Sequence, residues 1–201
     1  MRIWLVTGAS RGLGSALVHA VLAGGDAVVA TARVPEHIAA TSPGNEQRLL
    51  RCRLDVTDPD TVRTAVAAAV ERFGRIDVLV NNAGRGLFGA VEETSVDEAK
   101  TLFDTNVFGV LSVTNAVLPV MRAQRSGHVL MMSSMGGFAS GAGFGVYAAS
   151  KFAVEGLAEA LCERSRRSGS RSRSSNPGFS RPTSRRQARS RPAAPSTTTA
   201  G

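Results

Sequence analysis

A glycine-rich turn near the start of the chain constrains the fold more than any other feature. An apolar run at residues 3–7 leads into Thr7-Gly8-Ala9-Ser10-Arg11-Gly12-Leu13-Gly14, and apolar residues then recur with helical spacing up to Gly24-Gly25. A short apolar run that ends at glycine is typical of a buried parallel strand. Glycines let the backbone approach a phosphate closely, and the free N–H groups at a helix start bind its charge. The segment therefore predicts a strand, a phosphate-binding turn and a helix.

The same alternation of strand and helix continues through the first 161 residues. Further strands are predicted at 27–32, 50–55, 76–80 and 128–133, and helices at 59–73, from residue 95 and at 105–121. Asp58 is placed to cap a helix that starts at Pro59, and Ser95 with Glu98 forms a capping box for another. Strands and helices in alternation require a parallel sheet with helices on both faces and right-handed crossovers. The pattern therefore predicts an α/β fold with a doubly wound parallel sheet.

A second informative segment contains Tyr147, the only tyrosine of the chain, and Lys151. A helix would place these two side chains on one face, about 6 Å apart. A neighbouring ammonium favours the phenolate, and a fall of about 3 units in the pKa of the phenol would correspond to roughly 4 kcal/mol. The pair therefore indicates a tyrosine that can exchange a proton near neutral pH. The alternative, on these two residues alone, is a surface helix with an exposed aromatic ring.

Several motifs occur in the order found in the short-chain dehydrogenases/reductases, and residues 1–161 resemble this family. The matching segments are TGASRGLG (7–14), LDVTD (54–58), NNAG (81–84), Asn106, Ser133-Ser134 and YAASK (147–151). Each motif is weak alone, but the full set in this order is specific. The resemblance implies a Rossmann-like fold and an NAD(P)-dependent oxidoreductase. Such an enzyme transfers a hydride between a nicotinamide cofactor and an alcohol or carbonyl substrate.

The resemblance also implies a catalytic tetrad of Asn106, Ser134, Tyr147 and Lys151. Ser134 is preferred to Ser133 because it lies thirteen positions before Tyr147, the usual spacing in the family. Ser134 and Tyr147 would bind the substrate oxygen, Tyr147 would exchange the proton, and Lys151 would lower the pKa of Tyr147 and bind the nicotinamide ribose. The backbone carbonyl of Asn106 would hold a water that connects Lys151 to solvent. The alternative for Asn106 is a buried amide that binds a nearby carbonyl.

The cofactor would lie along the glycine turn and the carboxyl ends of the strands. The implied cofactor-binding residues are Gly8, Ser10, Arg11, Gly12, Leu13, Gly14, Arg33, Asp55, Asn81, Ala83, Gly84, Tyr147 and Lys151. Asp55 would bind the adenine amino group. In NAD-preferring folds a carboxylate near the end of the second strand binds the ribose, whereas a basic residue there accommodates a 2′-phosphate. Arg33 and Arg11 therefore predict NADP(H) as the preferred cofactor, with NAD(H) or two merely solvated arginines as alternatives.

The character of the sequence changes after Leu161. Residues 162–201 hold 10 of the 24 Lys and Arg and one of the 16 Asp and Glu, so the net charge of +8 belongs to this end. The segment is rich in Arg, Ser and Pro and cannot bury enough apolar surface to fold. We therefore predict a dinucleotide-binding domain at 1–161, truncated after the fifth strand and the following helix, and a disordered tail at 162–201. A change of reading frame in a GC-rich gene is our hypothesis for the tail.

Composition also bears on other classes of protein. Cys52 and Cys162 have neither the spacing of a disulfide framework nor that of a zinc site, and no metal site is predicted. No signal sequence or membrane span is recognised, which favours a soluble cytoplasmic protein. Its partner would be a small alcohol or ketone, and glycines and phenylalanines at 86–91 and 136–144 suggest that this substrate is apolar. A homo-oligomer formed through the helices at 105–124 and 147–161 stays open.

Two rival interpretations remain. The chain could be an inactive remnant that at most binds the dinucleotide, because the elements that close the site in the family are absent. Alternatively, the basic tail could bind nucleic acid by counterion release. Nucleic-acid binding is disfavoured because residues 162–201 contain no Lys, Tyr or Trp, and only Phe179 for stacking.

Overall fold

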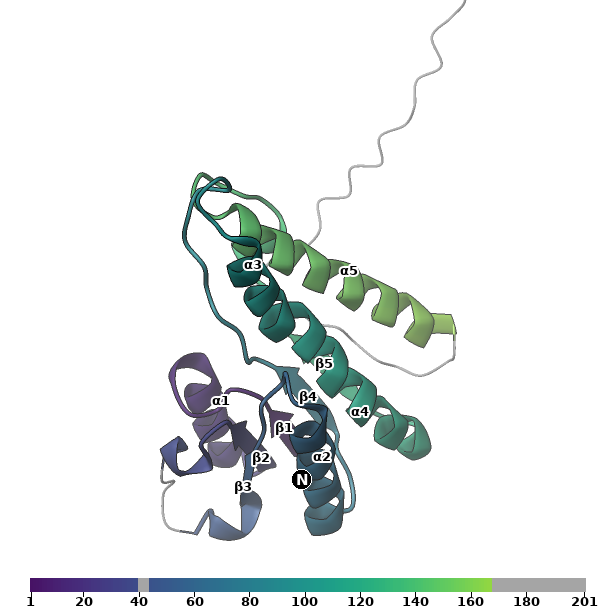
Figure 1. Cartoon of the computed structure of the whole chain (residues 1–201). Coiled ribbons are helices and arrows are strands. Elements are labelled where there is room, and N and C mark those ends of the chain that lie inside the picture. The colour runs from purple at the N-terminus through teal and green to yellow at the C-terminus, as the bar shows by residue number, and fades with distance from the viewer. Residues whose placement is uncertain (40–43, 168–201) are drawn as a thin grey trace, which may run out of the picture.

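The computed structural model describes residues 1–39 and 44–167, and its centre is one parallel sheet (Figure 1). Its strands are β1 Ile3–Val6, β2 Ala27–Ala32, β3 Leu49–Arg53, β4 Val78–Asn81 and β5 His128–Met131. Their order in space is β3-β2-β1-β4-β5, and every neighbouring pair is parallel. The chain starts at the centre and adds strands first on one side and then on the other. This confirms the predicted Rossmann-like, doubly wound sheet.

Helices connect the strands and cover both faces of the sheet. They are α1 Gly12–Ala23, α2 Pro59–Phe73, α3 Val96–Phe103, the π-helix η3 Asp104–Phe108, α4 Gly109–Gln124 and α5 Gly145–Arg167. Three single turns of 3₁₀ helix lie between them: η1 Pro35–His37, η2 Glu46–Arg48 and η4 Met135–Gly137. Figure 1 shows α1 on one side of the sheet and α2 with α4 on the other.

The core has two layers because alternate residues of a strand point to opposite faces. Leu5 and its counterparts on neighbouring strands pack against α2 and α4, whereas Val6 and its counterparts pack against α1. The first layer contains Leu5, Val29, Leu79, Val62, Val66, Val113 and Val117, and the second contains Val6, Val28, Val80, Val18 and Leu22. All the strands run the same way, so their carboxyl ends and the loops that follow gather at one edge.

The predicted helix starts are confirmed at atomic detail. The Asp58 carboxylate accepts hydrogen bonds from the backbone N–H groups of Asp60 and Thr61, with Pro59 at the first helical position. Ser95 Oγ accepts from the backbone N–H of Glu98, and the Glu98 carboxylate accepts from that of Ser95. These bonds satisfy N–H groups that have no partner inside a helix.

The long helical region Val96–Gln124 differs from its prediction by containing a π-turn. The helical pattern around Asn106 is confirmed, but residues Asp104–Phe108 form a wider turn that joins α3 to α4. By length and composition alone this region of 29 residues could cross a membrane, since an 18-residue window within it has a mean hydropathy of 1.2. Its buried residues Val113 and Val117 pack in the core against the sheet, which accounts for the apolar composition.

Several predicted boundaries are shifted: β3 and β4 span Leu49–Arg53 and Val78–Asn81 rather than 50–55 and 76–80. The fifth strand ends at Met131 rather than at residue 133, because its neighbour β4 ends at Asn81, the partner of Met131. Helix α5 continues to Arg167, six residues past the end predicted for this helix at residue 161. Glu and Arg are good helix formers and do not need burial to extend a helix. The predicted disorder and frame change concern a segment that, from residue 168 on, lies outside the described residues.

Candidate active site

The turn between β1 and α1 is shaped by glycines in ways that other residues would not tolerate. Gly8 and Gly12 have φ angles of +67° and +56°, in the left-handed region. A Cβ atom on Gly14 would overlap the carbonyl oxygen of Gly8 and the side-chain amide of Asn82. Arg11 at the N-cap makes no side-chain capping bond, and the first turn of α1 has no acidic residue. The first N–H groups of α1 therefore remain available to an anion.

Asn82 and Thr7 hold this turn against the segment that follows β4. The Asn82 side-chain amide donates to the carbonyl oxygens of Thr7 and Gly8 at 2.9 and 3.1 Å. In return Thr7 Oγ1 accepts from the backbone N–H groups of Asn82 and Ala83, both at 3.0 Å. The segment 82–84 is thereby held beside the glycine turn. Asn82 is absent from the predicted set, although the NNAG motif contains it.

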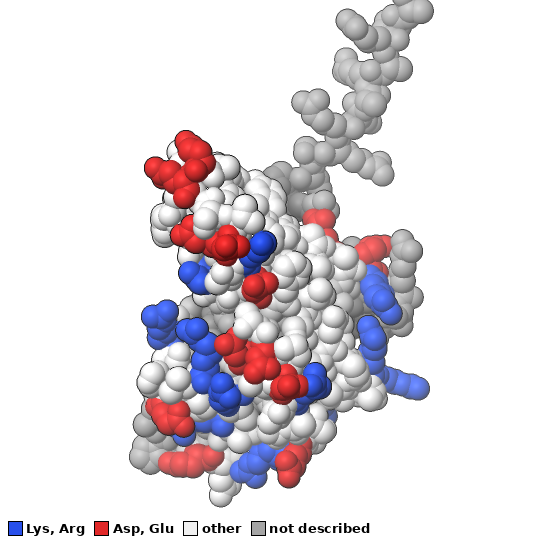
Figure 2. Space-filling view, viewed as in Figure 1, with Lys and Arg blue, Asp and Glu red and all other residues white. Residues whose placement is uncertain are grey.

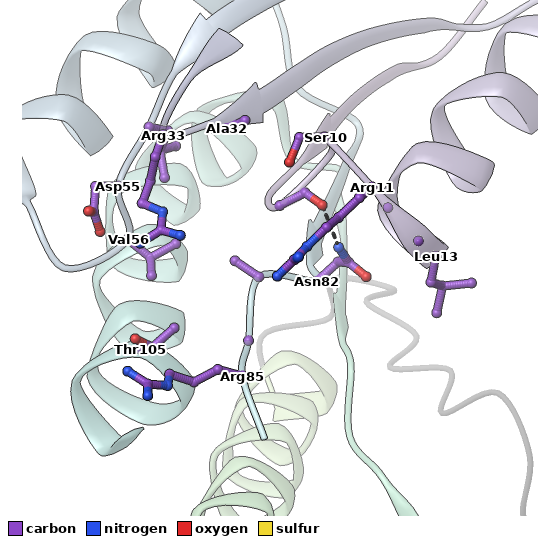
Figure 3. Close-up of a pocket in the computed structure, with 16 residues that line it drawn as sticks. Ser10, Arg11, Leu13, Ala32, Arg33, Asp55, Val56, Asn82, Arg85 and Thr105 are labelled. Atoms are coloured by element: carbon purple, nitrogen blue, oxygen red, sulfur yellow. Dashed lines mark hydrogen bonds between the residues drawn. The ribbon is translucent and has the colours of Figure 1, made fainter. Parts of the chain in front are cut away.

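A cleft of about 540 Å³ opens at the carboxyl ends of β1 to β4 (Figure 3). Ten predicted cofactor-binding residues line it: Gly8, Ser10, Arg11, Gly12, Leu13, Gly14, Arg33, Asp55, Ala83 and Gly84. The prediction missed six others that line it, Ala32, Leu54, Val56, Asn82, Arg85 and Thr105. Leu54, Val56 and Asn82 belong to the LDVTD and NNAG motifs, so taking whole motifs would have found these three. Asn81 is not part of the lining: it is buried and donates to Thr114 Oγ1 at 3.0 Å.

The charged side chains of the cleft are mostly positive. Arg11, Arg33 and Arg85 line it together with a single acid, Asp55. Figure 3 shows Arg33, at the end of β2, beside Asp55, and Arg11 extending towards Asn82. In the view of Figure 2, Lys and Arg side chains gather on the side of the molecule that carries α1. This side of the cleft therefore favours an anionic ligand.

Asp55 stays ionised within this positive surrounding. Partial burial disfavours its charge, but hydrogen bonds from the backbone and hydroxyl of Thr57 and the charges of Arg33 and Arg53 outweigh that effect. The pKa of Asp55 is therefore below its ordinary value. An ionised carboxylate at this place can accept a hydrogen bond from an amino group.

Helix α5 brings Tyr147 and Lys151 together as predicted. The Lys151 ammonium lies 5.9 Å from the centre of the Tyr147 ring. Its Nζ donates to the carbonyl oxygen of Met132 at 2.9 Å, and only 8% of the residue is exposed. Burial lowers the pKa of Lys151, since a charge is less stable away from water. A Cβ atom on Gly84 would come within 3.8 Å of this Nζ, so the lysine lies beside the end of the cleft.

Asn106 links the cleft segment to α5 through its side chain. Its Oδ1 accepts from the Arg85 N–H, and its Nδ2 donates to the Arg85 carbonyl, both at 2.9 Å, and to Ser150 Oγ at 3.2 Å. Ser150 Oγ in turn donates to the carbonyl oxygen of Tyr147 at 2.7 Å. The Asn106 side chain is therefore a buried amide with its hydrogen bonds satisfied, which is the alternative considered from the sequence. That the backbone carbonyl of Asn106 holds a water stays a prediction. The π-turn η3 contains Asn106, and such turns are frequent at functional sites.

The two candidate serines have different surroundings. Half-buried Ser134 caps η4, where its Oγ accepts from the Gly136 N–H at 3.2 Å. A Cβ on Gly136 would lie 3.3 Å from the Tyr147 ring, so η4 packs directly against that ring. Ser133 Oγ is buried without a hydrogen-bond partner in the described part of the chain, and Gly137 lies over it. Ser134 is therefore the more accessible hydroxyl.

The parallel sheet, with a glycine turn and a cleft at its carboxyl edge, defines a Rossmann-like α/β protein. A family model described as short chain dehydrogenase matches residues 2–193. The chain therefore belongs to the short-chain dehydrogenase family. The match extends beyond residue 161, where the predicted resemblance ended. Within the described residues, no group of three or more His, Cys, Asp or Glu could hold a metal ion.

Similar proteins of known name are oxidoreductases. Oxidoreductase BOA17 of Botryotinia fuckeliana is 43% identical over 163 residues, which cover 81% of this chain and 60% of that protein. A 3-ketodihydrosphingosine reductase of Bacteroides thetaiotaomicron is 41% identical over 160 residues, which cover 80% and 57%. The chain thus spans about three fifths of the length of these relatives.

Solved structures of the family have the same fold. A short-chain dehydrogenase from Streptomyces avermitilis matches with a TM-score of 0.76 and 44% identity, over 83% of this chain and 61% of that one. An alcohol dehydrogenase from the archaeon Thermococcus sibiricus, complexed with 5-hydroxy-NADP, matches with a TM-score of 0.76 and 30% identity, over 82% and 71%.

Proposed function

We propose that this chain is an NAD(P)-dependent oxidoreductase that transfers a hydride between a nicotinamide cofactor and an alcohol or ketone. The observation that carries the proposal is the continuity between the cleft and the tyrosine. The cleft starts at the glycine turn and ends at Gly84, and Gly84 adjoins both Asn106 and Lys151. A dinucleotide that lies along the cleft would therefore end next to Tyr147.

The residues of the cleft fit such a cofactor. Gly14 lets the Gly8 carbonyl and the Asn82 amide pack closely against the turn, and Gly12 has open space where a Cβ would stand, so a pyrophosphate can approach the backbone at the start of α1. Gly8, Ser10 and Gly12 with Arg11 would hold the pyrophosphate, and Asp55 would accept a hydrogen bond from the adenine amino group. A similar solved structure, a gluconate 5-dehydrogenase from Burkholderia cenocepacia, is in complex with NADP and tartrate. The NADP bound to that protein supports a nicotinamide cofactor for this chain.

Within that arrangement each catalytic side chain has a defined task. A reduced nicotinamide, when bound, would supply the carbonyl carbon with a hydride, one proton with two electrons, from a C–H bond of its ring, which would be left oxidised. As the C–H bond forms and the C=O π bond breaks, Tyr147 donates its phenolic proton to the oxygen, which leaves an alcohol. Ser134 donates a hydrogen bond to the same oxygen and stabilises its developing charge. In the reverse direction Tyr147 accepts the proton.

Lys151 makes the proton transfer easier by its position. Its buried ammonium, one helical turn from Tyr147, stabilises the phenolate that remains after proton donation. Charges interact more strongly where water is excluded, so a buried lysine has a larger effect than an exposed one. The Met132 carbonyl holds the ammonium in place.

We further propose that NADP(H) is preferred to NAD(H). Arg33 follows β2 directly, lines the cleft, and lies where a 2′-phosphate of the adenosine ribose would be bound. Arg11 lines the same cleft from the glycine turn. The chain has no carboxylate at the end of β2 that would repel this phosphate.

The test is a comparison of the whole chain with its Tyr147→Phe variant. We expect NADPH binding, followed by fluorescence, in both proteins, because the substitution removes only a hydroxyl. Turnover of a panel of ketones should occur in the parent chain and fall by about 10²-fold or more in the variant, the usual loss for a missing general acid. An equally active variant would disprove the role of Tyr147.

A second candidate function is dinucleotide binding without turnover. It requires only the glycine turn and the cleft, both of which the described residues form. The two candidates differ in one readout: NADPH binding with no turnover of any ketone or alcohol would favour the second.

A further inference from the structure

Two loops extend from the site side by side. The first follows β4, runs through the end of the cleft at Gly84 and Arg85, and continues to α3. The second follows β5 and leads to α5. The backbone N–H of Gly89 in the first donates to the Gly143 carbonyl oxygen in the second at 3.0 Å. Figure 1 shows the two loops next to each other beyond the first turn of α5.

Three aromatic rings connect these loops to the proposed proton donor. The rings of Phe88 and Phe144 lie 4.6 Å apart with an angle of 60°, and those of Phe144 and Tyr147 lie 6.4 Å apart with the same angle. Both are edge-to-face arrangements, the geometry that aromatic pairs prefer. Phe88 is 76% exposed and Phe144 is 40% exposed. The series therefore runs from solvent, across two loops, to the Tyr147 ring.

The position of Phe144 is fixed by the backbone around it. Its N–H donates to the carbonyl oxygen of Gly141 at 3.1 Å, and its carbonyl oxygen accepts from the Ala148 N–H at 2.8 Å. Val91, on the first loop, lies 2.8 Å from where a Cβ on Gly145 would stand, so its exposed side chain packs against the start of α5. The rings are thus held by two loops that contact each other at more than one place.

Two segments of these loops, residues 86–91 and 135–146, form a largely apolar surface without charge, since they contain no Asp, Glu, Lys or Arg. In the first loop, Arg85 precedes the uncharged segment at the cleft, and Glu92 and Glu93 follow it. Exposed apolar surface next to a reactive group marks a ligand site more often than scattered apolar residues do. A carboxylate here would lose its hydration without meeting a cation of either segment.

We propose that Phe88 and Phe144 form an apolar wall that binds the larger substituent of the substrate. This inference rests on the proposed function and specifies its substrate class. The substrates are ketones, and the corresponding secondary alcohols, with an aryl or an extended alkyl group on one side of the reacting carbon. With the oxygen at Tyr147, that group lies along Phe144 and Phe88. Small or carboxylate-bearing ketones are poor substrates.

The experiment compares four ketones at saturating NADPH: acetone, pyruvate, acetophenone and 2-octanone. We expect kcat/KM for acetophenone and 2-octanone to exceed that for acetone and pyruvate by about 100-fold, since each well-placed apolar group contributes a factor of about ten or more. In Phe88→Ala and Phe144→Ala, the ratio of acetophenone to acetone kcat/KM should fall about tenfold. The control Phe108→Ala removes a ring that is also exposed, on η3 outside both loops, and should keep the ratio.

Binding separates a failure of this inference from a failure of the proposed function. Saturation-transfer NMR on the NADPH-loaded chain should show transfer to the acetophenone ring protons but not to pyruvate, and the Phe88→Ala/Phe144→Ala double variant should lose it. If saturation transfer to acetophenone is observed and is lost in the double variant, but no ketone is turned over, the wall is supported and the catalytic proposal fails. If turnover occurs with pyruvate or acetone favoured, or if both ring variants keep the parent ratio, the wall is refuted and the oxidoreductase proposal stands.

Discussion

At the scale of single residues, the site depends on contacts between side chains that are far apart in sequence. Tyr147 and Lys151 could be predicted together because one helical turn separates them. Asn82 and Ser150 could not be predicted in the same way. The Asn82 amide acts on the Thr7 and Gly8 carbonyls, and Ser150 receives the Asn106 amide, so both roles appear only once distant segments have packed.

The Ser150 hydroxyl links α5 to η3, so removing it should lower the stability of the fold. It bridges the Asn106 amide and the Tyr147 carbonyl in a fully buried position. Ser150→Ala should lower the free energy of unfolding by about 1–3 kcal/mol, the cost of buried polar groups left without a partner. Urea denaturation measures this. Thr64→Ala is the matched control, since its exposed hydroxyl donates to the Asp60 carbonyl on α2, and its change should stay within about 0.5 kcal/mol.

Arg33 is the residue through which cofactor preference can be tested. A charge-assisted contact to a phosphate contributes about 1.5–3 kcal/mol, so Arg33→Ala should weaken NADPH binding by roughly 10- to 100-fold. NADH binding should change little, because NADH has no 2′-phosphate. Fluorescence titrations with both cofactors give the ratio. Arg63→Ala, an exposed arginine on α2 paired with Asp60, should leave both affinities unchanged. An equal loss for NADH and NADPH would refute the preference.

At the scale of elements, the sequence patterns predicted which segments form strands and helices. They did not predict irregular turns within a helix or the residue at which each helix ends. The capping residues Asp58 and Ser95 were predicted because caps are local. The π-turn at Asp104–Phe108 was not, since it depends on how α3, α4 and α5 pack around Asn106. The end of α5 was also misplaced, because a change in composition does not by itself end a helix.

The joint between β1 and α1 offers a test at this scale. In Gly14→Ala the added methyl group would overlap the Gly8 carbonyl and the Asn82 amide, both fixed by other bonds. The turn must then move, so we expect lower stability by about 1–3 kcal/mol, as for overpacked sites, and NADPH affinity lower by at least about tenfold. Gly24→Ala, at the other end of α1, has a φ of −74° and space for a methyl group. It should change neither quantity appreciably.

At the scale of the whole molecule, the parallel direction of the strands and the helices on both faces were predicted, because right-handed crossovers leave few topologies for alternating strands and helices. The strand order β3-β2-β1-β4-β5 came from the structure. The position of the cleft follows from the strand order. After β3 the chain adds β4 on the other side of β1, so the loops that follow β1 and β4 turn away from each other and leave a crevice between them. The substrate side was less predictable. It depends on loop contacts such as Gly89 with Gly143, which have no signature in a single sequence.

The stability of the whole molecule should fall in acid, and Asp26 gives a test of the cause. Its carboxylate accepts hydrogen bonds from the Arg2 backbone N–H and Nε and from Trp4 Nε1, which join the start of β1 to the loop before β2. The Arg2 backbone bond is the largest cause of the lowered pKa of Asp26, and Trp4 and the Arg2 charge add to it against partial burial.

A carboxyl group whose pKa is lower in the folded than in the unfolded chain stabilises the fold above its unfolded pKa, roughly pH 4, and loses this contribution as the pH falls through the folded pKa. Asp26→Asn should therefore be less stable than the parent at pH 7, and the difference should shrink towards pH 3. Urea midpoints at both pH values measure it. Asp97→Asn is the control, because its pair with Lys100 is exposed and should contribute little at either pH. A difference for Asp26→Asn that stays constant with pH would mean that its charge is not what stabilises the fold.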